Sequence, residues 1–284
     1  MARAGVRRLD NAARSGRQSV THMTIPHIAL VTGAGRGIGA AVAAELARVG
    51  ATVVLAARSL DECERTAQTL RSGGGRAFAV TLDVGDPASI AAALARVRGE
   101  VGAPDWLVNN AGIAVSAPLC PKDGSADELY ERHMAVNFHG ARRIAEALLP
   151  AMRAARYGRI VNIASSAGLR GYRYVAAYCA SKHALMGWAR AAALELDGSG
   201  VQVASVCPHY VDSPMTDASV RTIAAKTGRS ESEARTLLAA ENPSGKLVEP
   251  AQIARVVREL LQGECNGAEV ELDGGEPRYH PTQR

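Results

Sequence analysis

Residues 28–39 read IALVTGAGRGIG, in which an apolar strand runs into a glycine-rich turn and then into an alanine-rich helix that continues to Val49. Glycines in such a turn let the backbone approach a phosphate closely, and the helix that begins near Gly37 offers free N–H groups and a positive dipole end. The spacing, G-x-x-x-G-x-G, differs from the common G-x-G-x-x-G fingerprint. Because the glycines lie between a strand and a helix, we favour a dinucleotide site over a purely structural turn.

The next predicted strand, residues 52–56, indicates which dinucleotide binds. It ends about twenty residues beyond the glycines, where an acidic residue would bind the ribose hydroxyls of NAD. Ala57 and Arg58 stand there instead, and Arg36 lies inside the glycine turn. Two guanidinium groups can hold a 2′-phosphate with bidentate hydrogen bonds. We therefore predict that NADP(H) is preferred and NAD(H) possible, the alternative being two solvated arginines.

Strands and helices alternate along the rest of the chain. Further strands are predicted at 77–82, 106–108, 159–163, 201–206 and 269–272, and helices at 61–72, 127–156, 178–196 and 250–262. This alternation predicts an α/β fold, a Rossmann-type doubly wound parallel sheet of about seven strands with helices on both faces. A chain of 284 residues that is 47% hydrophobic fits a single domain. We place that domain at 25–276, with a polar, mobile insertion at about 215–245 and a tail at 277–284.

The charge distribution argues against nucleic-acid binding. Of the formal net charge of +5, the first 22 residues supply +4 from five arginines and one aspartate, which leaves about +1 for the rest. Nucleic-acid binding would need a basic stripe on the folded body. Segment 1–24 is expected to be a disordered leader, or the product of a misassigned start, because Met23 stands just before the first strand. Its many arginines and few acids also resemble a transit peptide.

Membrane and metal classes are likewise disfavoured. No apolar run approaches the ~18 residues of a membrane-spanning helix. The five cysteines form no C-x-x-C pair, and their odd number suits reduced thiols in a cytoplasmic protein. We predict a cytoplasmic protein with no membrane span and no metal site. The cysteines are Cys63, Cys120, Cys179, Cys207 and Cys265.

Polar and small residues follow several predicted strands, at the edge where open parallel sheets bind ligands. Asp83 and Val84 end one strand, and the Asp83 carboxylate could contact an adenine or cap the helix that starts near Pro87. Other candidates at strand ends are Asn110, Ala111 and Gly112, then Ser165 and Ser166, and finally the turn 207–214.

Tyr178 and Lys182 stand four residues apart in a segment with helical character, so their side chains project from one face. A lysine beside a tyrosine favours the phenolate by charge, which would bring a phenol with an ordinary pKa of about 10 into use as an acid or base nearer neutrality. Taken alone, the pair would equally suit an ordinary surface helix.

Together these features resemble the short-chain dehydrogenase/reductase family over about residues 26–276. The resemblance is carried by TGAGRGIG at 32–39, NNAG at 109–112, and Asn137, Ser165, Tyr178 and Lys182 in the expected order. It implies an NAD(P)-dependent oxidoreductase that moves a hydride between nicotinamide and a ketone or secondary alcohol. The cofactor-binding residues that it implies are Gly33, Arg36, Gly37, Ile38, Gly39, Arg58, Asp83, Val84, Asn110, Ala111, Gly112, Tyr178, Lys182, Pro208, Val211 and Ser213.

The resemblance also implies a catalytic role for four residues. Tyr178 would exchange a proton with the substrate oxygen, and Ser165 would hydrogen-bond that oxygen. Lys182 would bind the nicotinamide ribose and favour the phenolate, while Asn137 would hold a water beside Lys182. Ser165 is chosen because thirteen residues separate it from Tyr178, as is familiar in the family; Ser166 is the second choice. By helix propensity alone, Asn137 would point to solvent.

One position departs from the family pattern. The turn after the sixth strand usually reads Pro-Gly-x-Val-x-Thr, whereas this chain has His209 in place of the glycine and Ser213 in place of the threonine. If the backbone there requires a positive φ, the histidine costs about 1 kcal/mol. We expect a tolerated substitution, with contact to the substrate as the alternative.

Substrate class is indicated by the loop 169–174, LRGYRY, which concentrates aromatic residues and positive charge in a chain with few aromatics. This suits an anionic or carrier-linked substrate, or a subunit contact. The C-terminal pattern most resembles 3-oxoacyl-thioester and polyketide ketoreductases, with sterol, sugar and cyclic-alcohol dehydrogenases as the alternative. The resemblance further implies a homotetramer or homodimer built on helices 127–156 and 178–196. A catalytically silent nucleotide sensor would lack the intact Ser, Tyr and Lys set.

Overall fold

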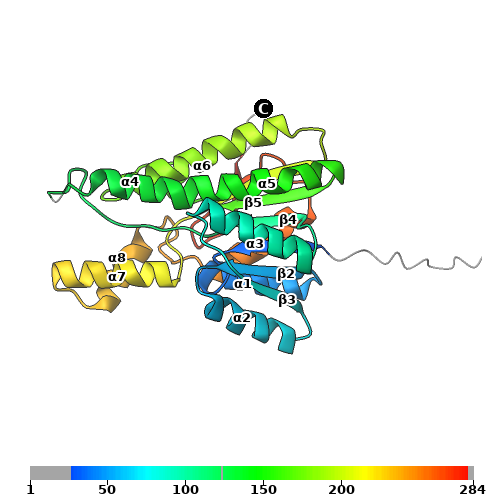
Figure 1. Cartoon of the computed structure of the whole chain (residues 1–284). Helices are drawn as coiled ribbons and strands as arrows, with labels where there is room; N and C mark the ends of the chain where they lie inside the picture. Colours follow the sequence, from blue (N-terminus) through cyan, green and yellow to red (C-terminus); the bar gives the residue numbers. More distant parts are fainter. Residues whose placement is uncertain (1–26, 123, 281–284) are drawn as a thin grey trace, which may run out of the picture.

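The computed structural model describes residues 27–122 and 124–280, and in them eight strands form one sheet. Along the sheet the strands follow the order β3-β2-β1-β4-β5-β6-β7-β8, all parallel except β8 against β7 (Figure 1). The strands are β1 (Ile28–Thr32), β2 (Thr52–Ala57), β3 (Arg76–Thr81), β4 (Trp106–Asn109), β5 (Gly158–Ile163), β6 (Val201–Pro208), β7 (Glu269–Leu272) and β8 (Arg278–His280).

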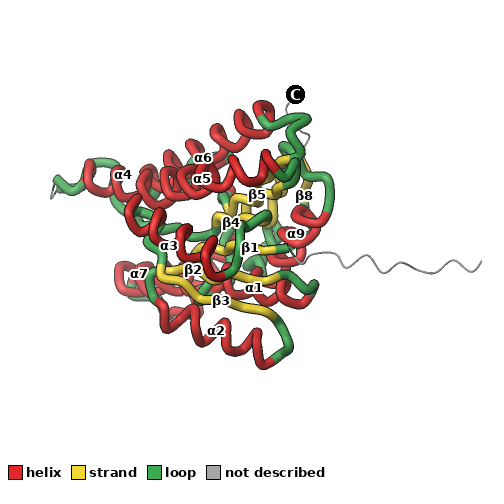
Figure 2. The backbone as a smooth tube through the Cα atoms, turned by 45° about the vertical axis from the view of Figure 1, so that its right-hand side comes forward, coloured by secondary structure: helices red, strands yellow, loops and turns green. Residues whose placement is uncertain are grey.

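Helices cover both faces of the sheet, as Figure 2 shows. The strands are apolar along most of their length because both faces are buried, and alternate residues such as Val53 and Val54 enter different cores. One core packs α1 (Gly37–Arg48), α2 (Leu60–Ser72) and α9 (Pro250–Gln262) against the sheet. The other packs α3 (Pro87–Glu100), α5 (Ala141–Ala154) and α6 (Ala176–Glu195).

The predicted fold class is confirmed, and the sheet order explains where ligands can bind. The chain runs from β1 outward to β3 and then returns to place β4 on the other side of β1. The segments that leave β1 and β4 therefore diverge to opposite faces, which opens a crevice at the carboxyl ends of these strands. The glycine turn and the NNAG segment meet at this crevice.

Three features differ from the sequence prediction. The eighth strand, β8, lies in the stretch predicted as a tail, and the region predicted as a mobile insertion contains α7 (Pro214–Thr227) and α8 (Glu231–Ala240). Figure 1 shows these two helices projecting at the same end of the molecule as α4 (Ala126–Met134). The long helix predicted at 127–156 is α4 and α5 joined by a π-helical turn at Ala135–Gly140. The predicted leader, 1–24, lies outside the described residues.

The described residues bear on the membrane and metal predictions. Within 27–122 and 124–280, no helix is both long and apolar enough to cross a membrane. In the same part of the chain, no group of three or more His, Cys, Asp or Glu side chains is arranged to hold a metal ion.

Gly39 provides a test of the packing at the glycine turn. A Cβ at Gly39 would lie 2.3 Å from the Gly33 carbonyl oxygen and 2.6 Å from Asn110 Nδ2, so G39A should lower the unfolding free energy by about 1–3 kcal/mol. The matched control is G99A in α3, where a Cβ meets nothing within 4 Å, and it should stabilise by up to about 1 kcal/mol. Urea unfolding measures both; equal midpoints for the two variants would contradict this packing.

Candidate active site

The glycine turn presents the open end of α1 to the crevice. Gly33 and Gly37 adopt left-handed backbone, with φ of 65° and 57°, which favours glycine at both positions. Arg36 precedes the helix and makes no side-chain cap, whereas Ser59 and Asp86 cap the starts of α2 and α3. No acidic residue lies in the first turn of α1. The free N–H groups of this turn, which begins at Gly37 and includes Ile38 and Gly39, therefore fit a phosphate.

Arg36 and Arg58 both lie at the outer side of this turn. Arg58 is exposed just after β2, and Arg36 borders a cavity of about 360 Å³ that lies between the turn and α2. The Arg36 side chain is 68% exposed and its Nη1 is 3.4 Å from Glu62 Oε1. Such an exposed ion pair contributes little to stability, so the guanidinium can exchange its partner. The cavity lies on the predicted cofactor side, away from Tyr178.

Asp83 is not the cap of α3. Its Oδ1 accepts a hydrogen bond from Gly85 N at 2.9 Å, and Asp86 caps the helix by accepting from Ala88 N at 2.9 Å. The capping alternative for Asp83 is therefore wrong, and contact with an adenine stays a prediction. Val84 follows Asp83 and is buried against the π-helical turn. Gly140 has no side chain and leaves room there for the Val84 carbonyl.

Asn110 joins the NNAG segment to the glycine turn. Its Nδ2 donates to the Thr32 carbonyl at 2.8 Å and to that of Gly33 at 3.2 Å. The Thr32 hydroxyl in turn accepts from the backbone N–H groups of Asn110 and Ala111. Since its amide is used in this way, Asn110 holds the turn in place. A Cβ at Gly112 would lie 3.2 Å from Asn137 Oδ1 and 3.7 Å from Lys182 Nζ, so Gly112 leaves this space open.

Ser165 lies near enough to Tyr178 to lower the pKa of its phenol, and Lys182 lies beside them. Lys182 is 4% exposed; its Nζ donates to the Ile163 carbonyl at 2.8 Å and lies 5.8 Å from the centre of the Tyr178 ring. Ser166 instead pairs its hydroxyl with that of Tyr172 at 2.8 Å. The geometry therefore favours Ser165 over Ser166 as the partner of Tyr178.

Asn137 is buried, contrary to the expectation from helix propensity. The π-helical turn directs its side chain inward, where Nδ2 donates to the Ile113 carbonyl and the Ser181 hydroxyl, both at 2.9 Å. Its Oδ1 accepts from Ile113 N at 2.8 Å. π-Helical turns of this kind are frequent at functional sites. The water-holding role implied by the family stays a prediction.

The expected effect of Lys182 on Tyr178 is not seen. Burial raises the pKa of Tyr178 to about 12, and the hydrogen bond with Ser165 lowers it only in part. Burial also lowers the pKa of Lys182 to about 8. The phenol thus keeps its proton at neutral pH, because loss of solvent favours its neutral form. Tyr178 is suited to give a proton, and Lys182 remains largely charged below pH 8.

His133 belongs to this site and was missed from the sequence. It is fully buried, its ring meets the Tyr178 ring edge-on at 6.4 Å, and its Nε2 accepts from Val115 N at 3.1 Å. Its Nδ1 donates to the Leu129 carbonyl, and burial lowers its pKa, so the ring is neutral. His133 precedes Asn137 by four residues, a spacing that could have indicated a shared helix face.

The turn after β6 closes the crevice from the other side. A Cβ at Gly37 would meet Pro214 Cδ at 3.3 Å, so Ser213, which caps α7, lies beside the glycine turn. Pro208 accepts a hydrogen bond from Ser165, and Val211 pairs with Val248. These contacts place Pro208, Val211 and Ser213 around the crevice, and their contact with a cofactor stays a prediction.

His209 causes no backbone strain. Among the described residues, only Arg156 and Tyr174 are non-glycine residues with positive φ, so the expected cost at His209 is absent. The side chain is buried and its Nε2 donates to Glu271 Oε1 at 2.6 Å. The alternative of direct substrate contact is not favoured, because the ring is directed into this polar network.

An α/β sheet with a helix N-terminus that fits a phosphate, beside a serine, tyrosine and lysine, is the arrangement of a nucleotide-dependent oxidoreductase. The family model described as short chain dehydrogenase matches residues 27–224. The chain is 37% identical over 253 residues to 3-oxoacyl-(acyl-carrier-protein) reductase FabG of Pseudomonas aeruginosa, which covers 87% of this chain and 96% of that one. It is 38% identical over 248 residues to 2-(S)-hydroxypropyl-CoM dehydrogenase 3 of Xanthobacter autotrophicus, covering 86% and 94%.

Solved structures agree with these relatives. A single-residue variant of the actinorhodin polyketide ketoreductase with NADPH superimposes with a TM-score of 0.82 at 34% identity, covering 88% of this chain and 97% of that one. The L-sorbose reductase of Gluconobacter frateurii with NADPH and L-sorbose gives 0.80 at 28% identity, covering 88% and 96%. The chain belongs to the short-chain dehydrogenase/reductase family and is an NAD(P)-dependent oxidoreductase.

The lowered pKa of Lys182 predicts an alkaline limb in the pH profile. Its ammonium is present below about pH 8 and is lost as the pH rises through that value, whereas Tyr178 keeps its proton to about 12. We expect kcat/KM for ketone reduction to fall by up to about tenfold per pH unit above 8. Steady-state kinetics from pH 6 to 10 measures this, with circular dichroism as the control for unfolding. A flat profile to pH 10 would contradict the assignment.

Proposed function

We propose that this protein is an NADPH-dependent ketoreductase that acts on 3-oxoacyl thioesters. The observation that carries the proposal is the grouping of Ser165 and Tyr178 beside buried Lys182, with Tyr178 still protonated at neutral pH. A protonated phenol next to a hydroxyl is the arrangement that carbonyl reduction requires, since the developing alkoxide must receive a proton.

Each of these side chains has a defined task in the proposal. The bound nicotinamide would supply a hydride to the carbonyl carbon. Ser165 donates a hydrogen bond to the carbonyl oxygen and holds it beside the phenol. Tyr178 transfers its proton to that oxygen and becomes a phenolate, which the nearby Lys182 ammonium stabilises until solvent returns the proton. Asn137 and His133 hold the segment Ile113–Val115 at the edge of the site.

The relatives support the thioester assignment and also give the alternative. The reductase of Pseudomonas aeruginosa is named for a 3-oxoacyl carrier substrate, and the actinorhodin enzyme is a polyketide ketoreductase. The neighbour bound to L-sorbose acts on a sugar. A sugar, sterol or cyclic alcohol, with NAD, therefore remains the second candidate for the substrate.

Assembly into a homodimer or homotetramer is part of the proposal. The helices expected to form the contact are α5 and α6, and the outer face of α6 carries Leu194, which is 62% exposed.

Tyr178→Phe tests the chemistry. The variant keeps the ring against His133 but has no proton to give, so kcat should fall by at least about 10²-fold while NADPH binding stays within about twofold. Loss of absorbance at 340 nm with acetoacetyl-CoA measures turnover, and fluorescence titration measures binding. Undiminished turnover in this variant would exclude the mechanism, and activity of the wild type on cyclic ketones or sugars alone would exclude the thioester substrate.

The double variant R36Q/R58Q tests the cofactor preference. If these guanidinium groups bind the 2′-phosphate, the KM for NADPH should rise about 10- to 100-fold while that for NADH changes little. E62Q is the matched control: it frees Arg36 from its carboxylate partner and should not raise the KM for NADPH. Wild-type preference for NADH, or equal changes for both cofactors, would count against the assignment.

A further inference from the structure

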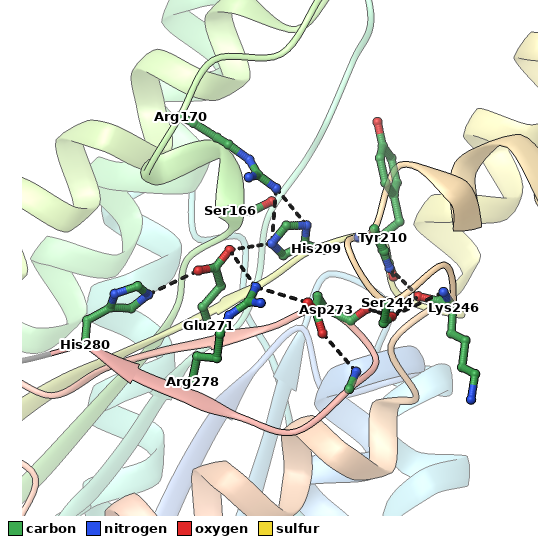
Figure 3. A network of polar contacts seen from close by, with 12 residues as sticks. Ser166, Arg170, His209, Tyr210, Ser244, Lys246, Glu271, Asp273, Arg278 and His280 are labelled. Carbon is green, nitrogen blue, oxygen red and sulfur yellow. Dashed lines mark hydrogen bonds and ion pairs between the residues drawn. The ribbon is translucent and has the colours of Figure 1, made fainter.

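A chain of polar side chains connects the serine turn to the C-terminal strand (Figure 3). Glu271 on β7 is its centre: Oε1 accepts from His209 Nε2 at 2.6 Å, and Oε2 accepts from His280 Nε2 at 3.1 Å. Arg278 Nη2 lies 3.4 Å from Glu271 Oε1 and 3.0 Å from Asp273 Oδ2. Although burial alone would raise the pKa of Glu271, the His209 hydrogen bond and the Arg278 charge lower it. The carboxylates of Glu271 and Asp273 thus share Arg278 as a cationic partner.

Arg170 lies against the His209 ring. Its Nη2 is 3.1 Å from Nδ1 and 3.3 Å from Nε2, and a donor this close to both nitrogens stands over the ring rather than on the in-plane lone pair of either one. Nε2 donates to Glu271, and this hydrogen bond fixes the orientation of the ring beneath the guanidinium.

Arg170 is held by two aromatic side chains. Its Nε donates to the Tyr172 hydroxyl at 2.9 Å, its guanidinium lies 5.4 Å from the centre of the Tyr172 ring, and its Nη2 lies over the His209 ring. In 27–122 and 124–280, no carboxylate lies within ion-pair distance of Arg170 and no protein atom accepts from its Nη1. An exposed, oriented guanidinium whose charge is not compensated is preorganised for an anion.

This guanidinium lies next to the proposed site of reduction. The Tyr172 hydroxyl that accepts from Arg170 also pairs with that of Ser166, the neighbour of Ser165. The Tyr172 ring meets the Tyr210 ring edge-on, and Tyr210 in turn raises the pKa of Tyr178. A ligand that placed its carbonyl at Ser165 and Tyr178 could therefore extend along these two tyrosines to Arg170.

We propose that Arg170 binds an anionic oxygen-acid group of the carbonyl substrate, and that His209, oriented by Glu271, is the residue that positions it. The inference rests on the proposed ketoreductase function and adds the charge of the substrate. Two sources share this chemistry: the carboxylate of a free 3-oxo acid and the phosphate of a carrier-linked thioester.

Three substrates distinguish these sources. Acetoacetate presents a carboxylate, acetoacetyl-CoA presents phosphates, and acetoacetyl-N-acetylcysteamine is a thioester without charge. R170Q should lower kcat/KM for the anionic substrate about 10- to 100-fold and leave the neutral thioester within about twofold. R98Q, which removes an exposed arginine from α3, is the matched control and should change neither. Loss with acetoacetate alone identifies the carboxylate, and loss with acetoacetyl-CoA alone identifies the phosphate.

Equal losses on charged and neutral substrates, or no loss on either, would overturn the role of Arg170. If the wild type reduced none of the three, the ketoreductase proposal would fail separately. Calorimetric binding of acetoacetate and of CoA to the wild type and to R170Q then decides the anion site without turnover. Weaker binding of either anion by R170Q supports the site, and equal or undetectable binding refutes it.

Variants of His209 test its positioning role. H209L removes the planar ring beneath Arg170 and the hydrogen bond to Glu271, and it should raise KM for the anionic substrate as R170Q does, with kcat for the neutral thioester unchanged. H209Q keeps a donor to Glu271 and a planar amide beneath Arg170, so it should restore KM. An unchanged KM in H209L would exclude the role.

Discussion

The hydrogen bonds between Thr32 and Asn110 organise the whole crevice. The buried Thr32 hydroxyl accepts from two backbone N–H groups, and the Asn110 amide donates back to Thr32 and Gly33. These hydrogen bonds join the ends of β1 and β4 at the point where the strand order reverses across the sheet. They also hold the glycine turn so that the start of α1 stays accessible from the crevice. Beyond Gly112 the same segment is held by Asn137 and His133, so one run of contacts connects the phosphate-binding turn to Tyr178.

Burial decides the electrostatics of the catalytic group more than charge does. Lys182 and Tyr178 come close enough to interact, yet removal from solvent favours the neutral form of each, so the pKa of Lys182 falls to about 8 while that of Tyr178 rises to about 12. This arrangement keeps a proton on Tyr178 and a charge on Lys182 at pH 7. In the proposed reaction, Tyr178 is the proton donor and the Lys182 ammonium stabilises the phenolate that results.

The architecture followed from sequence because its causes are local. Apolar runs separated by helical periodicity are enough to predict a parallel sheet, and the glycine turn and the Tyr178 to Lys182 spacing are visible within a few residues. Helix propensity alone predicted that Asn137 points to solvent, and this was wrong because propensity describes single residues. The π-helical turn that directs Asn137 inward lies where Gly140 packs closely against Val84. The short strand β8 was missed for a similar reason. Its three exposed residues carry no strand pattern, and their partners Glu271 and Asp273 become evident only in the folded sheet.

The two ends of the crevice hold their cations in different ways, and this difference bears on selectivity. Arg36 is paired with Glu62, so an anion that reaches it must compete with a carboxylate already present. Arg170 is oriented by an imidazole and a phenol, neither of which carries a compensating charge. An anion at Arg170 displaces no charged partner and meets a guanidinium whose orientation is already set, so less ordering is required on binding. Glu271 lies on the other side of His209, where it accepts from Nε2 and pairs with Arg278 on β8, and among the described residues no ion pair joins it to Arg170. The charge of Arg170 is therefore available to the proposed anion.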